Sequence, residues 1–161
     1  MFKKVITYSD FDGNARTDTL YFNLSTTEFY TVMQGLKSDK LDSLVQSGDV
    51  VEMLRVIQNF VLASYGEKSD DGKRFLKNDA IREDFAQSAA YDALIEDFLT
   101  NGETAYDFIR GLIPAKLSEA MTSQGFTLSG ISEKIQNGTI RNSDDFKREY
   151  NLENPNIKIL E

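Results

Sequence analysis

The chain has 161 residues, a length that suits one domain of ordinary size and excludes two large ones. It contains no cysteine and no histidine, which excludes disulfides, thiolate nucleophiles, imidazole acid–base chemistry and nearly every zinc site. Its 26 acidic and 18 basic residues give a net charge of -8, and the basic ones are scattered, so no nucleic-acid binding is expected. Without a membrane-length apolar run or a signal-peptide pattern, the sequence predicts a cytoplasmic protein that binds no membrane.

The chain begins with two runs rich in β-branched and aromatic residues. They are "KKVITYS" at residues 3–9 and "DTLYFNL" at residues 18–24, and the turn-rich "DFDGNAR" separates them. This pattern predicts a β-hairpin.

The turn itself contains Asp-Phe-Asp-Gly, which raises two chemical alternatives for Asp10 and Asp12. A phosphatase nucleophile loop of the haloacid-dehalogenase type needs a buried parallel strand and βαβ units, which the sequence lacks. A calcium-binding loop needs glycine at its sixth position and glutamate at its twelfth, where Ala15 and Tyr21 stand. Asp, Gly and Asn also favour turns through bonds to their own backbone, so we interpret the stretch as the hairpin turn.

Two longer helices are predicted next. Ser25 and Glu28 have the spacing of a capping box and open a helix through about residue 37. Residues 38–49 carry turn and cap residues around a short helical or irregular piece. From Asp49 to Tyr65 a wide apolar stripe recurs at helical spacing, which predicts the central and most buried helix.

The stretch "SYGEKSDDGKRFLK", residues 64–77, combines glycine with clustered charge. Its glycines and lysines do not match the spacing of a phosphate-binding P-loop. We therefore predict a solvated connection between helices, and its unusual composition makes it a candidate contact surface.

Three short helices are predicted after this connection, at residues 80–87, 88–102 and 103–113. Asn78 or Asp79 can cap the first, and Pro114 ends the third. The second and third have apolar faces, formed by Tyr91, Leu94, Ile95 and Phe98 and by Ala105, Phe108, Ile109 and Leu112. Neighbouring carboxylates lack the spacing and apolar setting of an acid–base pair, so no catalytic centre and no cofactor or metal site is expected.

The expected fold class is mainly α, of the α+β type: an N-terminal β-hairpin followed by a compact bundle of short helices. The hairpin and the helices are predicted to form a domain at residues 1–121. Residues 122–161 are rich in Ser, Thr, Asn, Gln and Gly, and we expect a loosely packed polar tail with one or two short helices.

Several stretches together resemble the tail assembly chaperones of long, non-contractile-tailed bacteriophages of Gram-positive hosts. They are "YSDFDGNARTDTLYFNLSTTE", "LASYGEKSDDGKRFLKND", "FAQSAAYDALIEDFL" and "AYDFIRGLIP", in this order. The resemblance covers roughly residues 3 to 115, and the tail from about Thr122 adds nothing to it.

This resemblance implies a mostly helical protein without enzymatic activity. Such chaperones coat the phage tape measure protein, keep it soluble and help to bring tail tube subunits onto it before they are displaced. It further implies self-association, a longer product made by programmed frameshifting in many members, and a place in the host cytoplasm rather than in the mature virion.

Client contact is predicted on the stretch 66–77 and on the exposed parts of the helices from Asp79 to Ile113. The candidate partner-binding residues are Tyr65, Lys68, Lys73, Arg74, Phe75, Tyr91, Tyr106 and Arg110. The rival hypotheses are an acidic DNA-mimic inhibitor of a host enzyme and a structural head–tail or tube component. Interspersed basic residues disfavour the former, and the low predicted β-content disfavours the latter.

Overall fold

The computed structural model describes residues 1–36 and 49–152, so the predicted irregular piece at 38–49 lies almost wholly outside the described residues. The elements in chain order are β1 (Phe2–Ser9), β2 (Ala15–Phe22), α1 (Thr26–Gly35), α3 (Val50–Ser64), β3 (Tyr65–Lys68), β4 (Phe75–Leu76), α4 (Asp79–Ala86), α5 (Ala89–Thr100), α6 (Gly102–Leu112), α7 (Ala115–Gln124), α8 (Leu128–Gln136) and α9 (Ser143–Glu149). The predicted class, mainly helical with an N-terminal β-hairpin, is confirmed.

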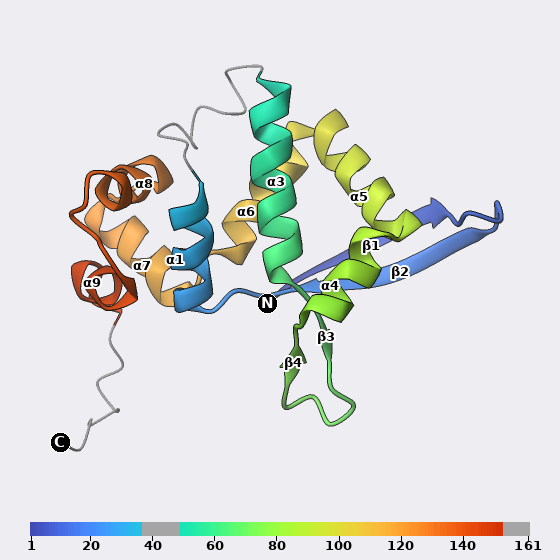
Figure 1. The fold of residues 1–161 in the computed structure, drawn as a ribbon, viewed down its shortest axis with the longest axis horizontal. Helices are drawn as coiled ribbons and strands as arrows, with labels where there is room; N and C mark the ends of the chain where they lie inside the picture. Colours follow the sequence, from blue (N-terminus) through green and yellow to red (C-terminus); the bar gives the residue numbers. More distant parts are fainter. Residues whose placement is uncertain (37–48, 153–161) are drawn as a thin grey trace. The chain divides into compact units, whose positions relative to one another are not determined.

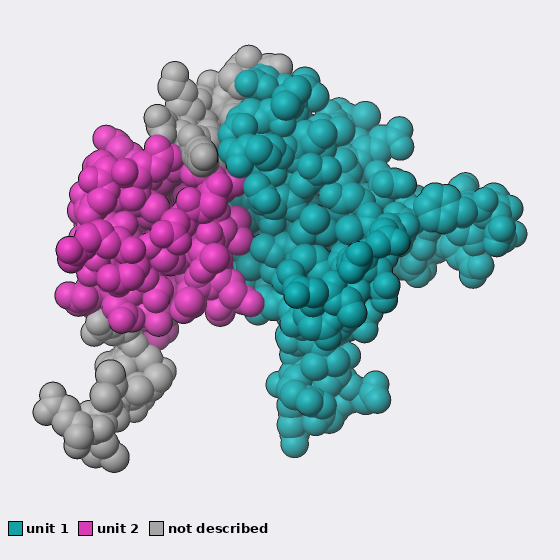
Figure 2. Space-filling view, viewed as in Figure 1, with its two compact units in different colours: residues 1–24, 43–112 teal, residues 25–42, 113–161 magenta. Residues whose placement is uncertain are grey.

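The chain divides into two compact units (Figure 2). Unit 1 is formed by residues 1–24 and 43–112, and unit 2 by residues 25–42 and 113–161, in each case as far as the structure describes them. Helix α1 therefore belongs to the same unit as α7, α8 and α9. Helix α7 spans residue 121, the end of the domain predicted from the sequence, and α8 and α9 follow that residue.

The predicted hairpin turn in unit 1 is confirmed. The backbone N–H of Asp10 donates to Asn14 O at 2.9 Å, and that of Gly13 donates to Asp10 O at 2.9 Å. Gly13 has a φ of 83°, so the turn is the three-residue type that ends in a left-handed glycine. The Asp10 carboxylate accepts bonds from Arg16 Nε and from the Asn14 N–H, each at 2.8 Å, and these bonds lower its pKa. Asp10 therefore stabilises the turn.

Unit 1 contains a four-stranded antiparallel sheet in the order β1-β2-β3-β4. The β1–β2 hairpin extends beyond the helices as one arm, and β3–β4 forms a second, shorter arm (Figure 1). Alternate residues of β1 and β2 face α5 and α6, and the face is buried at Ile6, Leu20 and Phe22. The sheet and the helices therefore share one aromatic core.

The predicted helices of unit 1 are confirmed, and polar caps set their starts. The side chains of Asp49, Asn78 and Ser88 each accept a bond from a backbone N–H in the first turn of α3, α4 and α5. Helix α3 buries the stripe Val56, Ile57, Phe60 and Val61 that the sequence indicated. The stretch 64–77 was predicted to be a solvated connection between helices. It does connect α3 to α4, and it contains the β3–β4 hairpin, which was not predicted.

Unit 2 is a cluster of four described helices built around α1. The predicted capping box is present: Glu28 N donates to Ser25 Oγ at 3.2 Å, and Ser25 N donates to Glu28 Oε2 at 2.8 Å. Helix α1 packs against α8 and α9, and the rings of Tyr30 and Phe146 lie 5.4 Å apart. The helices α8 and α9 agree with the expectation of one or two short helices beyond residue 122, whereas α7 was not predicted. Residues 153–161 lie outside the described part.

Candidate partner-binding surface

The β3–β4 hairpin carries five of the predicted site residues, with Tyr65 as the first residue of β3. In its ladder Lys68 pairs with Phe75, and Glu67 pairs with Leu76. Lys73 and Arg74 lie in the connecting loop, with both side chains exposed. The structure therefore brings Lys68, Lys73, Arg74 and Phe75 together on one short arm of unit 1.

Side-chain bonds hold the loop of this hairpin in shape. Ser69 Oγ donates to Asp71 Oδ1 at 2.6 Å and accepts from Arg74 N at 3.0 Å. Asp71 Oδ1 also accepts from Lys73 N at 3.1 Å, and the Ser69 hydroxyl and this N–H lower the pKa of the Asp71 carboxyl. Gly72 completes the turn with a φ of 69°. The loop thus presents Lys73 and Arg74 from an ordered backbone.

The hairpin carries charges of both signs. Lys68, Lys73 and Arg74 have no ion pair within the described ranges, whereas the carboxylates of Glu67, Asp70 and Asp71 lie in the same short stretch. Lys68 Nζ lies 4.2 Å from the centre of the Tyr21 ring, a cation–π contact with β2. Such a balanced surface suits a protein partner better than a phosphate backbone, which favours a continuous basic patch.

Two predicted site residues, Tyr65 at the base of the hairpin and Tyr91 on α5, lie in or beside the core. The half-buried Tyr65 stacks on Phe85 with ring centres 3.6 Å apart, and burial raises its pKa, with Glu67 adding to the effect. Tyr91 is only 8% exposed and contacts the edge of Phe85 at 5.5 Å. Tyr91 therefore packs in the core and is not available to a partner in this structure.

Tyr106 and Arg110 form a separate pair on α6. The Arg110 guanidinium lies 5.6 Å from the Tyr106 ring centre, and Arg110 is exposed while Tyr106 is half-buried. Sequence reasoning missed Tyr21 and Phe85, which support Lys68 and Tyr65. An aromatic residue in a predicted strand or helix gives no signal of which distant residue it will contact.

Gly66 allows the close approach of β4 to β3. A Cβ atom added there would lie 2.6 Å from Phe75 Cε1 and 2.7 Å from the backbone oxygen of Leu76. We expect Gly66→Ala to force the strands apart and to lower the free energy of unfolding by about 1–3 kcal/mol. Urea unfolding measures this loss. Gly35→Ala, where a Cβ would meet nothing within 4 Å, is the control; equal losses in both variants would contradict the packing role of Gly66.

The described residues contain neither a group of three acidic side chains able to hold a metal ion nor a helix long and apolar enough to span a bilayer. The protein therefore has a mainly helical α+β fold, and its exposed β3–β4 hairpin is a candidate surface for a protein partner. The chain belongs to a family of phage tail assembly chaperones, whose model matches residues 1–156. Comparison with curated proteins and with solved structures found no match.

The extent of the family match corrects one expectation. The resemblance in sequence covered roughly residues 3 to 115, whereas the match includes α7, α8 and α9 as well. The polar C-terminal region is therefore part of the family's common sequence.

Proposed function

We propose that this tail assembly chaperone binds the phage tape measure protein, keeps it soluble in the host cytoplasm and helps to recruit tail tube subunits. Membership in the tail assembly chaperone family is the observation that carries the proposal. The role requires no catalysis and no cofactor, and it ends when the tube replaces the chaperone, so the mature virion would not contain it.

The surface of the protein suits weak, repeated contact with a long client. The exposed large apolar residues of unit 1 are scattered: Met1, Val5, Phe11, Val50, Val51 and Leu76. Several copies along one client would hold it strongly through avidity, while each single contact stays weak enough to be displaced. The net charge of -8 would keep a coated client soluble.

Within this proposal the exposed residues of the β3–β4 hairpin and of α6 contact the client. Lys68, Lys73 and Arg74 would pair with acidic side chains of the tape measure protein, and Phe75 would add apolar contact at the hairpin. Tyr106 and Arg110 would form a second contact on α6. Tail tube protein is the further partner.

Co-expression with the tape measure protein of the same genome tests the function. We expect the wild-type chaperone to keep the client soluble and to co-purify with it. Lys73→Glu should reduce the amount retained by about threefold, as for the loss of one exposed ion pair. Lys116→Glu makes the same charge change at an exposed position of α7 and should retain the wild-type amount.

Two results would contradict different parts of the proposal. An insoluble client that forms no complex with the wild-type protein would reject the chaperone function toward the tape measure protein. Equal retention by Lys73→Glu and by Lys116→Glu would leave that function in place and reject the hairpin as the contact.

A further inference from the structure

Strand β1 is an edge strand with an unpaired outer side. It is first in the sheet order, and β2 is its sheet neighbour. The bond from Asp10 N to Asn14 O sets the phase of the ladder, so even-numbered residues of β1 bond to β2. The backbone groups that point away from β2 belong to Lys3, Val5, Thr7 and Ser9, and within the described residues none of them has a hydrogen-bond partner.

Beyond Lys3 and Lys4, this edge lacks the usual protection against pairing. Natural edge strands carry charges, prolines or bulges that discourage the addition of another chain. The sequence of β1 from Val5 to Ser9 is "VITYS", with neither a charge nor a proline. Val5 is 58% exposed, and Phe11 in the adjoining turn is 78% exposed. The outer side of β1 is therefore open to an extended segment.

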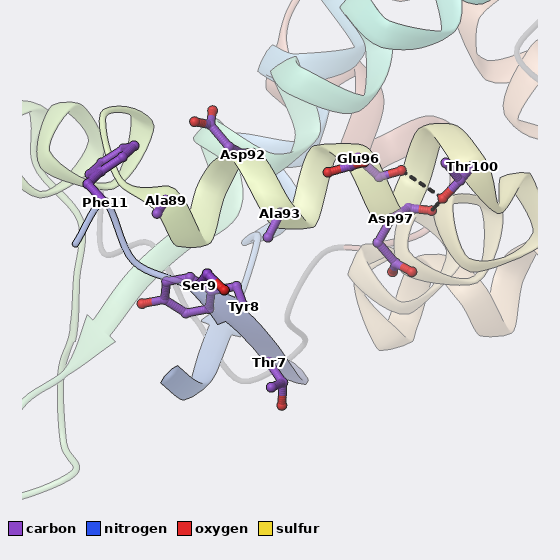
Figure 3. A pocket seen from close by; sticks show the side chains of 10 residues that line it. All are labelled: Thr7, Tyr8, Ser9, Phe11, Ala89, Asp92, Ala93, Glu96, Asp97 and Thr100. Atoms are coloured by element: carbon purple, nitrogen blue, oxygen red, sulfur yellow. Dashed lines mark hydrogen bonds between the residues drawn. The ribbon is translucent and has the colours of Figure 1, made fainter. Parts of the chain in front are cut away.

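A groove of about 530 Å³ runs between the end of β1 and helix α5 (Figure 3). Thr7, Tyr8 and Ser9 line it from the strand, although successive side chains of a strand point to opposite faces. Residues of both faces border the same space because the groove follows the edge of the strand. A strand added to β1 would occupy this groove.

Helix α5 lines the groove with small side chains and with acidic ones. Ala89 and Ala93 leave space beside the strand, and Figure 3 shows both side chains directed toward β1. Asp92 and Glu96 lie one turn apart, are exposed, and form no ion pair within the described ranges. Asp97 is already paired with Lys4, at 2.8 Å. Two carboxylates are therefore free to attract positive charge.

We propose that the β1–α5 groove binds an extended, lysine- or arginine-rich segment of the client, which adds to β1 as a further strand. Its backbone pairs with the outer N–H and C=O groups of β1, and alternate side chains reach Asp92 and Glu96. The proposal rests on the proposed chaperone function, because it assigns the segment to the client. It adds a binding mode and the chemistry of the segment.

A second copy of this chain fits the groove less well than a basic client. Two-fold pairing of β1 with its copy would place both α5 helices on the same face of the joined sheet. Asp92 and Glu96 of each copy would then approach those of the other, and like charges in proximity oppose association. Charge complementarity therefore favours a basic segment of a different protein.

Proline substitution at Thr7 tests strand addition. Thr7→Pro removes an outward N–H and leaves the ladder bonds to β2 in place. Thr17→Pro is the matched control, because Thr17 pairs with Thr7 in the register of β1 and β2. The hydroxyl oxygens of the two residues lie 3.1 Å apart, in hydrogen-bond distance. The backbone N–H of Thr17 points away from β1, so its loss leaves the outer side of β1 unchanged. We expect Thr7→Pro to weaken binding by about tenfold and Thr17→Pro to bind like wild type.

The probe is a short fluorescent peptide in which lysine and valine alternate, compared by fluorescence anisotropy with one in which glutamate replaces lysine. The wild-type chain should bind the lysine peptide, less tightly as salt rises, and should not bind the glutamate peptide. Glu96→Lys should weaken binding several-fold, whereas Glu83→Lys, the same charge change on an exposed residue of α4, should not. Co-purification of the tape measure protein with the same variants gives the second readout.

The outcomes separate the two proposals. If wild type fails to hold the tape measure protein, the chaperone function is rejected, and peptide binding still reports on the groove. If wild type holds it and Thr7→Pro and Glu96→Lys bind client and peptide equally well, strand addition is rejected. Equal weakening by Thr7→Pro and Thr17→Pro would also reject it, since general damage to the hairpin would then explain the loss.

Discussion

Phe22→Ala is expected to lower the free energy of unfolding by about 3–5 kcal/mol. Phe22 is fully buried, and its ring meets Phe108 edge-on at 5.0 Å, with Phe2, Tyr65 and Phe85 also within 6.5 Å. Removing it would leave a cavity where the sheet, α4, α6 and the base of the β3–β4 hairpin meet. Equilibrium unfolding in urea, followed by circular dichroism, measures the loss.

Tyr21→Ala is the control for this experiment. Tyr21 is the preceding residue of β2, and its half-buried side chain lies on the opposite face of the strand beneath Lys68. Its removal should cost about 1 kcal/mol or less, the usual contribution of a cross-strand pair. Similar losses in both variants would show that the aromatic cluster around Phe22 is not the main core of unit 1.

The first hairpin and the helix starts were predictable because their signals are local. "DFDGN" contains within five residues the carboxylate, the glycine and the turn geometry that the hairpin uses. The caps at Ser25, Asp49 and Asn78 likewise bond to N–H groups three residues away. Such interactions depend on sequence spacing alone.

The β3–β4 hairpin lacked a sequence signal of that strength. Strand β4 has only two residues, and charged residues and Gly72 fill the connection, so no alternation of apolar residues was visible. Lys77 Nζ bonds to Asn23 O at 2.9 Å, across 54 residues of sequence. Contacts over such a separation stabilise the hairpin, and the composition of the stretch does not reveal them.

The grouping of α1 with α8 and α9 also depends on distant residues. Hydrophobic residues are sparse beyond residue 122, yet Ile131, Ile140, Phe146 and Tyr150 are at most 1% exposed. A few large side chains, placed at the right turns, are sufficient to form this core. Sequence composition alone therefore underestimated how much of unit 2 packs around α1.

The candidate site was predictable in part. The charged positions of stretch 66–77 were chosen because of the unusual composition of the stretch, and Lys73 and Arg74 are exposed. Tyr91 was included among the candidates, although it shares a helical face with Leu94, Ile95 and Phe98, all of which are buried. The groove along β1 was not predicted, since it depends on the placement of α5 beside the strand.

Alkaline pH is expected to destabilise unit 2 through Tyr150. This residue is 1% exposed between the rings of Phe126 and Phe146, and burial raises its pKa from 10.0 to about 12. Because the pKa is higher in the folded state, the stabilisation is fully present below pH 10 and is lost as the pH rises through 12. The loss amounts to about 2–3 kcal/mol.

Tyr150→Phe isolates this contribution, because it keeps the ring and removes the ionisable hydroxyl. Urea unfolding at pH 9 and at pH 12 should show a smaller fall in free energy for Tyr150→Phe than for wild type. For Tyr106→Phe, at a half-buried position on α6 of unit 1, the free energy of unfolding should fall by as much as for wild type. If the free energy of unfolding of Tyr150→Phe falls as steeply as that of wild type, ionisation of other groups causes the alkaline loss. If the difference is observed, the Tyr150 ring is held in a packed core at the end of α9.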